Sequence, residues 1–186
     1  MKLHPFLRFL CWLCNLPARL RGVKFGRFSY LGPGYDFLRG QMKNIVLDND
    51  VLIDKNAWLQ THGNGYIKIE DHNYIGRNLT ISATKGVLIK KGCLFSYHVS
   101  LLDHDHQFVA NLSPNYTLIT EGQEIIIGEN CFLGAHSFIL KGVTLGRNCV
   151  VGANSVVNHS FPAYSVIAGS PAKLIKKLTQ KENYVK

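Results

Sequence analysis

Two histidines and two aspartates alternate in the segment Asp103-His104-Asp105-His106. A neutral imidazole can take up a proton near pH 7, and a neighbouring carboxylate can fix the tautomer that does so. The segment is therefore a candidate general-base site in which either histidine could be the base, with Asp103 or Asp105 as its orienting partner. A solvated polar turn is the competing interpretation.

The candidate site lies at the start of a long interruption in a six-residue repeat. An apolar residue recurs at every sixth position, and an α-helix of 3.6 residues per turn cannot keep such a stripe on one face, whereas a strand can. The interruption runs from Leu101 to Ile125 and has no pattern of its own, which is typical of a functional or a disordered loop. The repeat positions form four runs: Leu47, Ile53 and Leu59; Ile69, Ile75, Ile81 and Val87; then, shifted by two residues, Ile89, Phe95 and Leu101; and, after the interruption, Ile127, Leu133, Ile139, Leu145, Val151 and Val157.

The repeat predicts an all-β fold. Three hexads form one coil of 18 residues with three short strands, and the first position of each hexad points inward to fill a triangular prism. The result is a parallel β-helix. The fifth position also faces inward, which explains Cys93, Cys131 and Cys149 as core residues. Because Cys131 and Cys149 are 18 residues apart, we expect them to stack, with Asn130 and Asn148 as a matching outward pair.

The chain is expected to form one structural domain with three parts. These are an N-terminal helix and lead-in (1–43), the β-helix (44–161) with its loop (103–124), and a C-terminal turn and helix (162–186). With 186 residues, of which 46% are hydrophobic, the chain is long enough for one core and short for two.

Both flanking segments predict a short helix. Residues 3–21 have the spacing of an amphipathic helix, interrupted near Pro17. This helix either caps the open end of the coils or lies on an anionic membrane surface. Residues 172–182, preceded by Pro171, predict the second helix.

The net charge of +9 is concentrated at the two ends of the chain. Residues 1–43 hold eight Lys or Arg and one acid, residues 162–186 hold five and one, and residues 44–161 hold eight and ten. A nucleic-acid-binding protein is expected to carry its positive charge on the folded body, so this distribution argues against nucleic acid as a partner. The longest apolar run, Phe9 to Cys14, is much shorter than the roughly 18 residues that span a bilayer.

The five cysteines favour a reducing compartment. Their number is odd, and we expect no secretory leader because Arg8, Arg19 and Arg21 interrupt the apolar start without a small-residue cleavage site. Cys11 and Cys14 have the spacing of half a zinc or redox site, but they fall within the apolar helical pattern and are interpreted as packing residues. We therefore expect a cytoplasmic protein, at the inner face of the membrane if the N-terminal helix binds lipid.

Three motifs carry a resemblance to a known family. They are IIIGENCFLGAH (125–136), GVTLGRNCVVGANSVV (142–157) and IAGSPAK (167–173). With them the chain resembles the hexapeptide-repeat acyltransferases over roughly residues 45–176, and it is most similar to the maltose, galactoside and polysaccharide O-acetyltransferases. The resemblance implies left-handed coils, a homotrimer with sites between neighbouring prisms, and acetyl-CoA as acyl donor without a metal. The acceptor it implies is a hydroxyl, in preference to an amine, of a sugar or of a cell-surface polysaccharide precursor.

The resemblance also implies roles for individual residues. A histidine at the start of the loop deprotonates the acceptor. An ungapped comparison selects His106, which is the expected base, and a shift of two residues would select His104 instead. Phe132 and His136 would contact the acceptor, Phe132 standing where galactoside-type relatives often have Trp. The acetyl-CoA contacts would be Gly134, Ala135, Ala153, Asn158, His159, Lys173 and Lys176, with Asn158 and His159 standing where relatives commonly have Thr and Lys.

Two other functions remain open from the sequence. Carbonic anhydrases on the same fold bind zinc through three histidines at a trimer interface, and this chain has His98, His104, His106 and His136. The paired-histidine spacing of that family, H-x4-H, is missing. The other alternative is a non-catalytic trimeric β-helix that serves as a scaffold.

Overall fold

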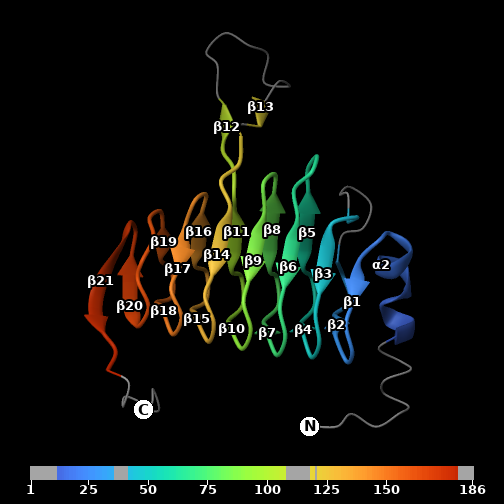
Figure 1. Cartoon of the computed structure of the whole chain (residues 1–186), viewed down its shortest axis with the longest axis horizontal. Helices are drawn as coiled ribbons and strands as arrows, with labels where there is room; N and C mark the ends of the chain where they lie inside the picture. Colours follow the sequence, from blue (N-terminus) through green and yellow to red (C-terminus); the bar gives the residue numbers. More distant parts are fainter. Residues whose placement is uncertain (1–11, 36–41, 108–117, 120, 180–186) are drawn as a thin grey trace.

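The computed structural model describes residues 12–35, 42–107, 118–119 and 121–179. The strands form three sheets that the chain visits in turn, so that each circuit makes one coil of a solenoid (Figure 1). Sheet A contains β1 (Lys24–Phe25), β3 (Ile45–Leu47), β6 (Ile67–Ile69), β9 (Val87–Ile89), β14 (Ile125–Ile127) and β17 (Thr144–Leu145). Sheet B contains β2 (Tyr30–Leu31), β4 (Leu52–Ile53), β7 (Tyr74–Ile75), β10 (Leu94–Phe95), β15 (Phe132–Leu133), β18 (Val150–Val151), β20 (Ser165–Gly169) and β21 (Ala172–Lys177). Sheet C contains β5 (Trp58–Thr61), β8 (Thr80–Ala83), β11 (Ser100–Leu102), β16 (Phe138–Leu140) and β19 (Val156–Val157).

The core runs along the axis of the solenoid. Side chains at the first position of the hexads, such as Leu47, Ile75, Leu101, Ile127 and Val151, are fully buried. Their neighbours along each strand face outward, as the period of two requires. The strand pairs between successive coils are parallel. The predicted left-handed parallel β-helix is confirmed. The sheets begin at β1 and continue through β21, beyond the expected bounds of 44 and 161.

Cys131 and Cys149 stack as predicted, and the structure adds Cys93 to the same row. Cys93, Cys131 and Cys149 are buried and lie one position before the paired residues Leu94, Phe132 and Val150 of sheet B. The thiols of Cys93 and Cys131 donate to the backbone carbonyls of Gly128 and Gly146, at 3.1 and 3.2 Å. The predicted outward pair is also present, since Asn130 Nδ2 donates to Asn148 Oδ1 at 2.6 Å.

The coils differ in length, and the difference falls at one corner. Ile45 pairs with Ile67 and Ile67 with Val87, so these early coils are longer than the three hexads that separate Ile126 from its partner Thr144. The extra residues lie between sheet C and sheet A, in the segments 62–66, 84–86 and 103–124. We call this edge of the solenoid the loop corner. Because the insertions follow one another in successive coils, they lie side by side in space.

The corner between sheets B and C has a different local structure. Asn56, Asn78, His98, His136 and Asn154 occupy equivalent turn positions, and each has a positive φ between 56 and 62°. Non-glycine residues adopt this left-handed conformation rarely, and Asn does so most readily, so the turn explains why Asn recurs there. At His98 and His136 the same stacking brings two imidazole rings together.

The N-terminal helix is present over its described part. Residues 12–14 are helical and α2 spans Leu16–Leu20, with Pro17 in its first turn. The break lies at Asn15, whose buried amide donates to the carbonyl of Ser29 and accepts from the N–H of Leu31. The predicted interruption near Pro17 is therefore confirmed, while residues 3–11 lie outside the described part. The helix packs at the end of the solenoid next to β1 (Figure 1).

The prediction of a C-terminal helix is wrong. The segment forms strand β21, which pairs antiparallel with β20 and turns back at Ser170 and Pro171, with Gly169 opposite Ala172. The open edge of β20 offers unpaired backbone groups, and pairing with them outweighs the helical preference suggested by a proline at the first position. Residues 180–182 of the predicted helix lie outside the described residues.

Candidate active site at the loop corner

Asp103 is a buried carboxylate held by the preceding coil. It follows β11 in the inward register, and its side chain is fully buried. Oδ2 accepts from the N–H groups of Lys85 and Gly86 at 2.7 and 2.8 Å, and Oδ1 accepts from the N–H and the hydroxyl of Thr84 at 2.8 and 3.1 Å. The turn 84–86 thereby satisfies and orients a buried polar group that would otherwise be costly.

His104 is oriented by this carboxylate. Its Nδ1 lies 2.9 Å from Oδ1 of Asp103, and only 4% of its side-chain surface is exposed. In the neutral imidazole, a hydrogen bond to this carboxylate requires the proton on Nδ1 and leaves a lone pair on Nε2. The pair therefore has the arrangement of a general base with its orienting partner.

Two further histidines surround His104. The ring centroid of His62 lies 5.7 Å away and that of His106 lies 5.5 Å away, both in edge-on orientations. Nε2 of His62 is also 3.4 Å from the hydroxyl of Ser82. Burial lowers the pKa of His62, and the nearby His104 lowers it further.

His62 was missed in the sequence analysis. It lies far from His104 along the chain and belongs to no motif. The signal that could have revealed it is the alignment of the insertions, because residues 62 and 104 each follow a strand of sheet C by a similar distance, two coils apart.

The other half of the predicted tetrad lies nearer the solvent. Asp105 and His106 are exposed. Asp105 forms an ion pair with Lys141 of the next coil, which draws its carboxylate toward that coil. His106 begins β12 (His106–Gln107), which pairs antiparallel with β13 (Leu118–Ile119) above the loop corner (Figure 1).

The C-terminal end of the loop makes hydrogen bonds and close contacts at the same corner. The N–H of Gln123 donates to the carbonyl of Asp103 at 2.8 Å. The hydroxyl of Tyr66 contacts Glu124, and burial together with this carboxylate raises the pKa of Tyr66 to about 12. Gly122 approaches so closely that a Cβ there would lie 2.0 Å from Oγ1 of Thr84. The C-terminal end of the loop is therefore packed against Asp103 and the turn 84–86 that holds it.

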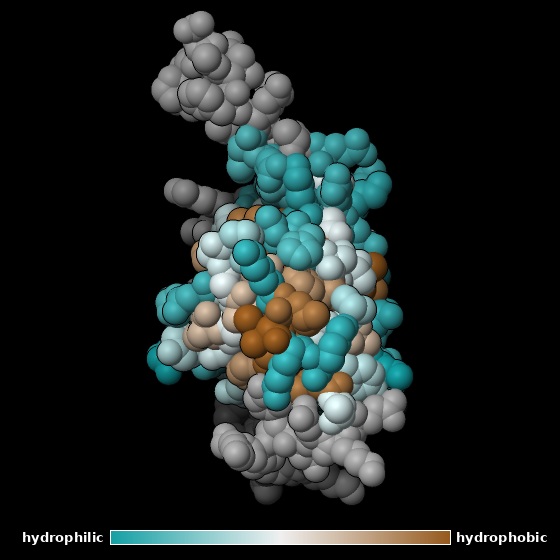
Figure 2. Space-filling model, turned by 90° about the vertical axis from the view of Figure 1, so that its left-hand side faces the viewer, coloured by the Kyte–Doolittle hydropathy of each residue, from teal (hydrophilic) through white to brown (hydrophobic). Residues whose placement is uncertain are grey.

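The predicted acetyl-CoA residues lie on three separate surfaces. Gly134, Ala135 and Ala153 are at the B–C corner, and a Cβ at Gly134 would lie 2.6 Å from the backbone nitrogen of Ala153. Asn158 and His159 are exposed at the loop corner after β19, with His159 Nδ1 2.9 Å from Asn158 Oδ1. The exposed Lys173 and Lys176 are on β21, at the end of the solenoid shown in Figure 2, where hydrophilic side chains border an apolar patch.

His136 also lies at the B–C corner, and it stacks on His98 of the preceding coil. The two ring centroids are 4.6 Å apart and the planes are inclined by only 7°. Nε2 of His98 is in turn 2.9 Å from Nδ2 of Asn78. His136 is thus part of a polar ladder at a corner that sheet C separates from the Asp103–His104 pair.

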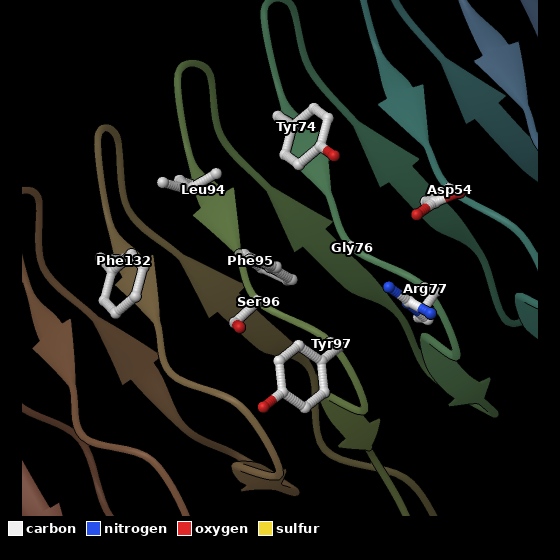
Figure 3. Close-up of a pocket in the computed structure, with 9 residues that line it drawn as sticks. All are labelled: Asp54, Tyr74, Gly76, Arg77, Leu94, Phe95, Ser96, Tyr97 and Phe132. Atoms are coloured by element: carbon white, nitrogen blue, oxygen red, sulfur yellow. The ribbon is translucent and has the colours of Figure 1, made fainter.

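Phe132 lines a hollow on the outer face of sheet B. The hollow has a volume of about 250 Å³, and Figure 3 shows Tyr74, Leu94 and Phe132 on successive strands of its floor, with Arg77 and Tyr97 to one side. Asp54, Gly76, Phe95 and Ser96 complete the lining. An apolar floor with a few polar groups at the rim is typical of a small-molecule site. Only Phe132 among these residues was a predicted site residue.

The described parts of the chain hold no cluster of three or more His, Cys, Asp or Glu side chains that converge as metal ligands. The same residues include no helix that is both long enough and apolar enough to cross a bilayer.

The fold and the site define a hexapeptide-repeat protein with a buried carboxylate–imidazole pair at the root of a loop. The model for the hexapeptide repeat of succinyl-transferase matches residues 124–159. The chain is 34% identical over 127 residues to a protein named as a lipopolysaccharide biosynthesis O-acetyl transferase, WbbJ of Escherichia coli K12, and the match covers 64% of each chain. It is 31% identical over 144 residues to the dTDP-4-amino-4,6-dideoxy-D-glucose acyltransferase of Escherichia coli, covering 74% of each chain.

A solved structure has the same fold. The galactoside acetyltransferase in complex with coenzyme A superposes with a TM-score of 0.63 at 21% identity, over 100% of this chain and 90% of that chain. Together with the sequence relatives, this shows that the chain belongs to the hexapeptide-repeat acyltransferase family. It is an acyltransferase.

Proposed function

We propose that this protein transfers the acetyl group of acetyl-CoA to a hydroxyl of a sugar or of a cell-surface polysaccharide precursor. The observation that carries the proposal is the buried Asp103–His104 pair at the root of the loop. Relatives named as O-acetyltransferases support the reaction class. A hydroxyl needs a base to remove its proton as the new bond forms, and an oriented imidazole supplies one.

In the proposed reaction, Nε2 of His104 takes the proton of the acceptor hydroxyl while the oxygen attacks the thioester carbonyl carbon. The C–O bond forms, the C–S bond breaks, and His104 returns the proton to the departing thiolate of coenzyme A. Asp103 keeps the ring in the required tautomer and stabilises the imidazolium that forms between the two proton transfers.

His104 suits the role of base better than His106, the residue selected by ungapped comparison with the family. His104 is buried against a carboxylate with a fixed orientation, whereas His106 is exposed and its neighbour Asp105 pairs with Lys141. His62 and His106 would flank the acceptor as it meets His104. In this arrangement both are hydrogen-bonding groups for the acceptor and neither is the base.

The acetyl-CoA contacts remain those predicted from the family. Ala135 and Ala153 are small residues at the surface of the B–C corner, and Gly134 beneath them lets the two coils pack closely, which suits the close approach of a narrow pantetheine chain. Lys173 and Lys176 are exposed cations that suit its phosphate groups. Asn158 and His159 supply hydrogen-bonding groups at the other edge of sheet C.

We propose a homotrimer with its sites between protomers. In a prism of three sheets, the loop corner between sheets C and A is opposite sheet B. The Asp103–His104 pair of one chain therefore cannot meet the hollow around Phe132 in the same chain, but it can meet that hollow in a neighbour. The aromatic floor of the hollow suits a sugar ring, and the rim residues Arg77 and Asp54 suit its hydroxyls.

We place the protein in the cytoplasm, at the inner face of the membrane. Acetyl-CoA is made and used there, and Cys14, Cys93, Cys131 and Cys149 are free thiols, as expected in a reducing compartment.

The test is an assay for acceptor-dependent release of coenzyme A thiol from acetyl-CoA, with pooled sugars and sugar nucleotides as acceptors and mass spectrometry of the products. We expect one acceptor to gain an acetyl ester that mild alkali removes. An alkali-stable acetamide would show an amine acceptor instead. Absence of acceptor-dependent thiol release with every pool would contradict the proposal and favour the non-catalytic scaffold.

A further inference from the structure

The N-terminal end of the solenoid has an apolar outer face. Ala18 and Asn15 are buried against the first coil, so the inner side of the helical segment closes the end of the stack. On its other side Trp12 and Leu13 are each 47% exposed and Leu20 is 80% exposed. Packing of the helical segment against the first coil therefore does not bury these three apolar side chains. Their exposure to solvent costs free energy.

The described residues of this end carry only positive charge. Residues 12–35 and 42–43 contain five Arg or Lys and no Asp or Glu. Lys24 and Lys43 are exposed, and with Lys68 they line a hollow of about 370 Å³ that extends along the outer face of sheet A from β1 to β6. Gly22, two residues after Leu20, packs against the backbone of Lys43, so the helix and the lysine hollow are adjacent.

We propose that this basic end, comprising Trp12, Leu13, Leu20, Lys24 and Lys43, docks on an anionic lipid bilayer. Exposed Trp and Leu side chains bordered by Lys and Arg are the pattern of a surface that lies in the membrane interface. A protein partner fits less well, because lysine is depleted in the centre of protein interfaces. Lys24 and Lys43, at the N-terminal end of the hollow, would contact lipid phosphate groups, and the apolar side chains would enter the boundary between headgroups and acyl chains.

The orientation of the protein on the bilayer follows from the direction of the solenoid axes in the proposed trimer, on which this inference rests. If three prisms pack side by side with parallel axes, their three N-terminal ends face the same way and contact one plane together. Three weak contacts then act as one strong attachment. The loop corners and the hollows on sheet B lie along the sides of the prisms, so the bilayer would leave the active sites open to a lipid-linked glycan that stands on the same surface.

The experiment is flotation of the full chain with vesicles of phosphatidylcholine alone or with roughly a third of phosphatidylglycerol. We expect binding to the anionic vesicles and weak binding to the neutral ones. Lys24→Gln with Lys43→Gln should reduce the partition coefficient per chain about 20- to 30-fold, because each lysine near a charged membrane contributes about 1 kcal/mol. Leu20→Glu should reduce it by a similar amount. Raising the salt concentration to about 1 M should weaken binding of the wild type.

Matched variants at other surfaces serve as controls. Lys55→Gln with Lys91→Gln removes the same charge from the sides of the solenoid, and Ile175→Glu changes a 63% exposed residue at the opposite end. Both controls should still bind. Failure to bind anionic vesicles, equal binding to neutral ones, or equal losses in the controls would overturn the proposal. Transfer to a soluble acceptor should be unchanged in Leu20→Glu, so failure of the proposed reaction would be recognised separately from failure of docking.

Discussion

Oδ1 of Asp103 lies 2.9 Å from Nδ1 of His104, and the two side chains are almost completely removed from solvent. Within the tetrad they are neighbours in sequence, yet they differ in register. Asp103 is in the inward register and accepts from the turn 84–86, whereas the ring of His104 lies beside those of His62 and His106. One carboxylate therefore links the backbone of the preceding coil to the proposed base, and this link is open to direct tests.

His104→Ala should lower kcat for acetyl transfer by a factor of about 10² to 10⁴, because a general base contributes this much in the transition state. The affinity for acetyl-CoA should stay within a few-fold of wild type, since His104 acts on the acceptor. His106→Ala is the matched control and should have a smaller effect on kcat. The measurements are steady-state kinetics and titration with coenzyme A. If His106→Ala is instead the inactive variant, the base is His106.

Asp103→Asn should lower both stability and kcat. The amide NH2 of Asn would face the N–H groups of Lys85 and Gly86 or those of Thr84 and His104, so at least one buried donor would lose its acceptor. The expected loss in the free energy of unfolding is about 1–3 kcal/mol.

Denaturant titration measures that loss, and kinetics below the unfolding transition separate it from misorientation of His104. The control is Asp105→Asn, which removes a solvent-exposed ion pair with Lys141 and should change stability by less than about 1 kcal/mol. Equal effects of the two variants would contradict the role of Asp103.

The stability of the protein should depend on His62 at mildly acidic pH. Burial and the neighbouring His104 lower the pKa of His62, so the folded state binds fewer protons at this side chain than the unfolded state does just below pH 6.5. This contribution to the free energy of unfolding is present above the unfolded-state pKa and is lost as the pH falls through the lower, folded-state pKa. His62→Gln should therefore make the pH dependence of unfolding shallower as the pH falls below about 6.5. Parallel curves for wild type and variant would show that His62 makes no such contribution.

Mixed trimers should reveal whether two chains build one site. His104→Ala removes the base and Phe132→Glu places a charge in the hollow on sheet B, so each variant alone should be nearly inactive. If His104 of one protomer works against Phe132 of the next, every trimer that contains both variants has one intact site of three, so mixed trimers should show about a third of the wild-type activity.

Coexpression with two different tags, tandem purification and the thiol-release assay give the measurement, and sedimentation checks that the assembly is a trimer. Sites contained within one chain would give no recovery in the mixture, and an active monomer would contradict the proposed assembly.

The correct and the wrong predictions differ in the range of the interactions on which they depend. The hexads predicted the solenoid, its buried stripe and the stacking of Cys131 on Cys149, because each of these depends on a short spacing that the chain repeats. The prediction of a C-terminal helix was wrong because residues 172–177 form a strand only when the edge of β20 is available to pair with them. That edge exists only in the folded protein, and nothing in the sequence of residues 172–177 indicates it. His62 was missed for the same kind of reason, since its proximity to His104 depends on the lengths of the two coils between them.

The sequence by itself determined the architecture and the region of the site: a β-helix with its loop opening at Asp103. The alternation of inward and outward side chains along each strand requires nothing from distant parts of the chain. Tertiary structure alone decided which histidine meets a carboxylate and which histidine comes from another coil. The insertions in successive coils place His62, Thr84 and His104 at one corner, and the backbone N–H groups of one turn then orient the aspartate of the next.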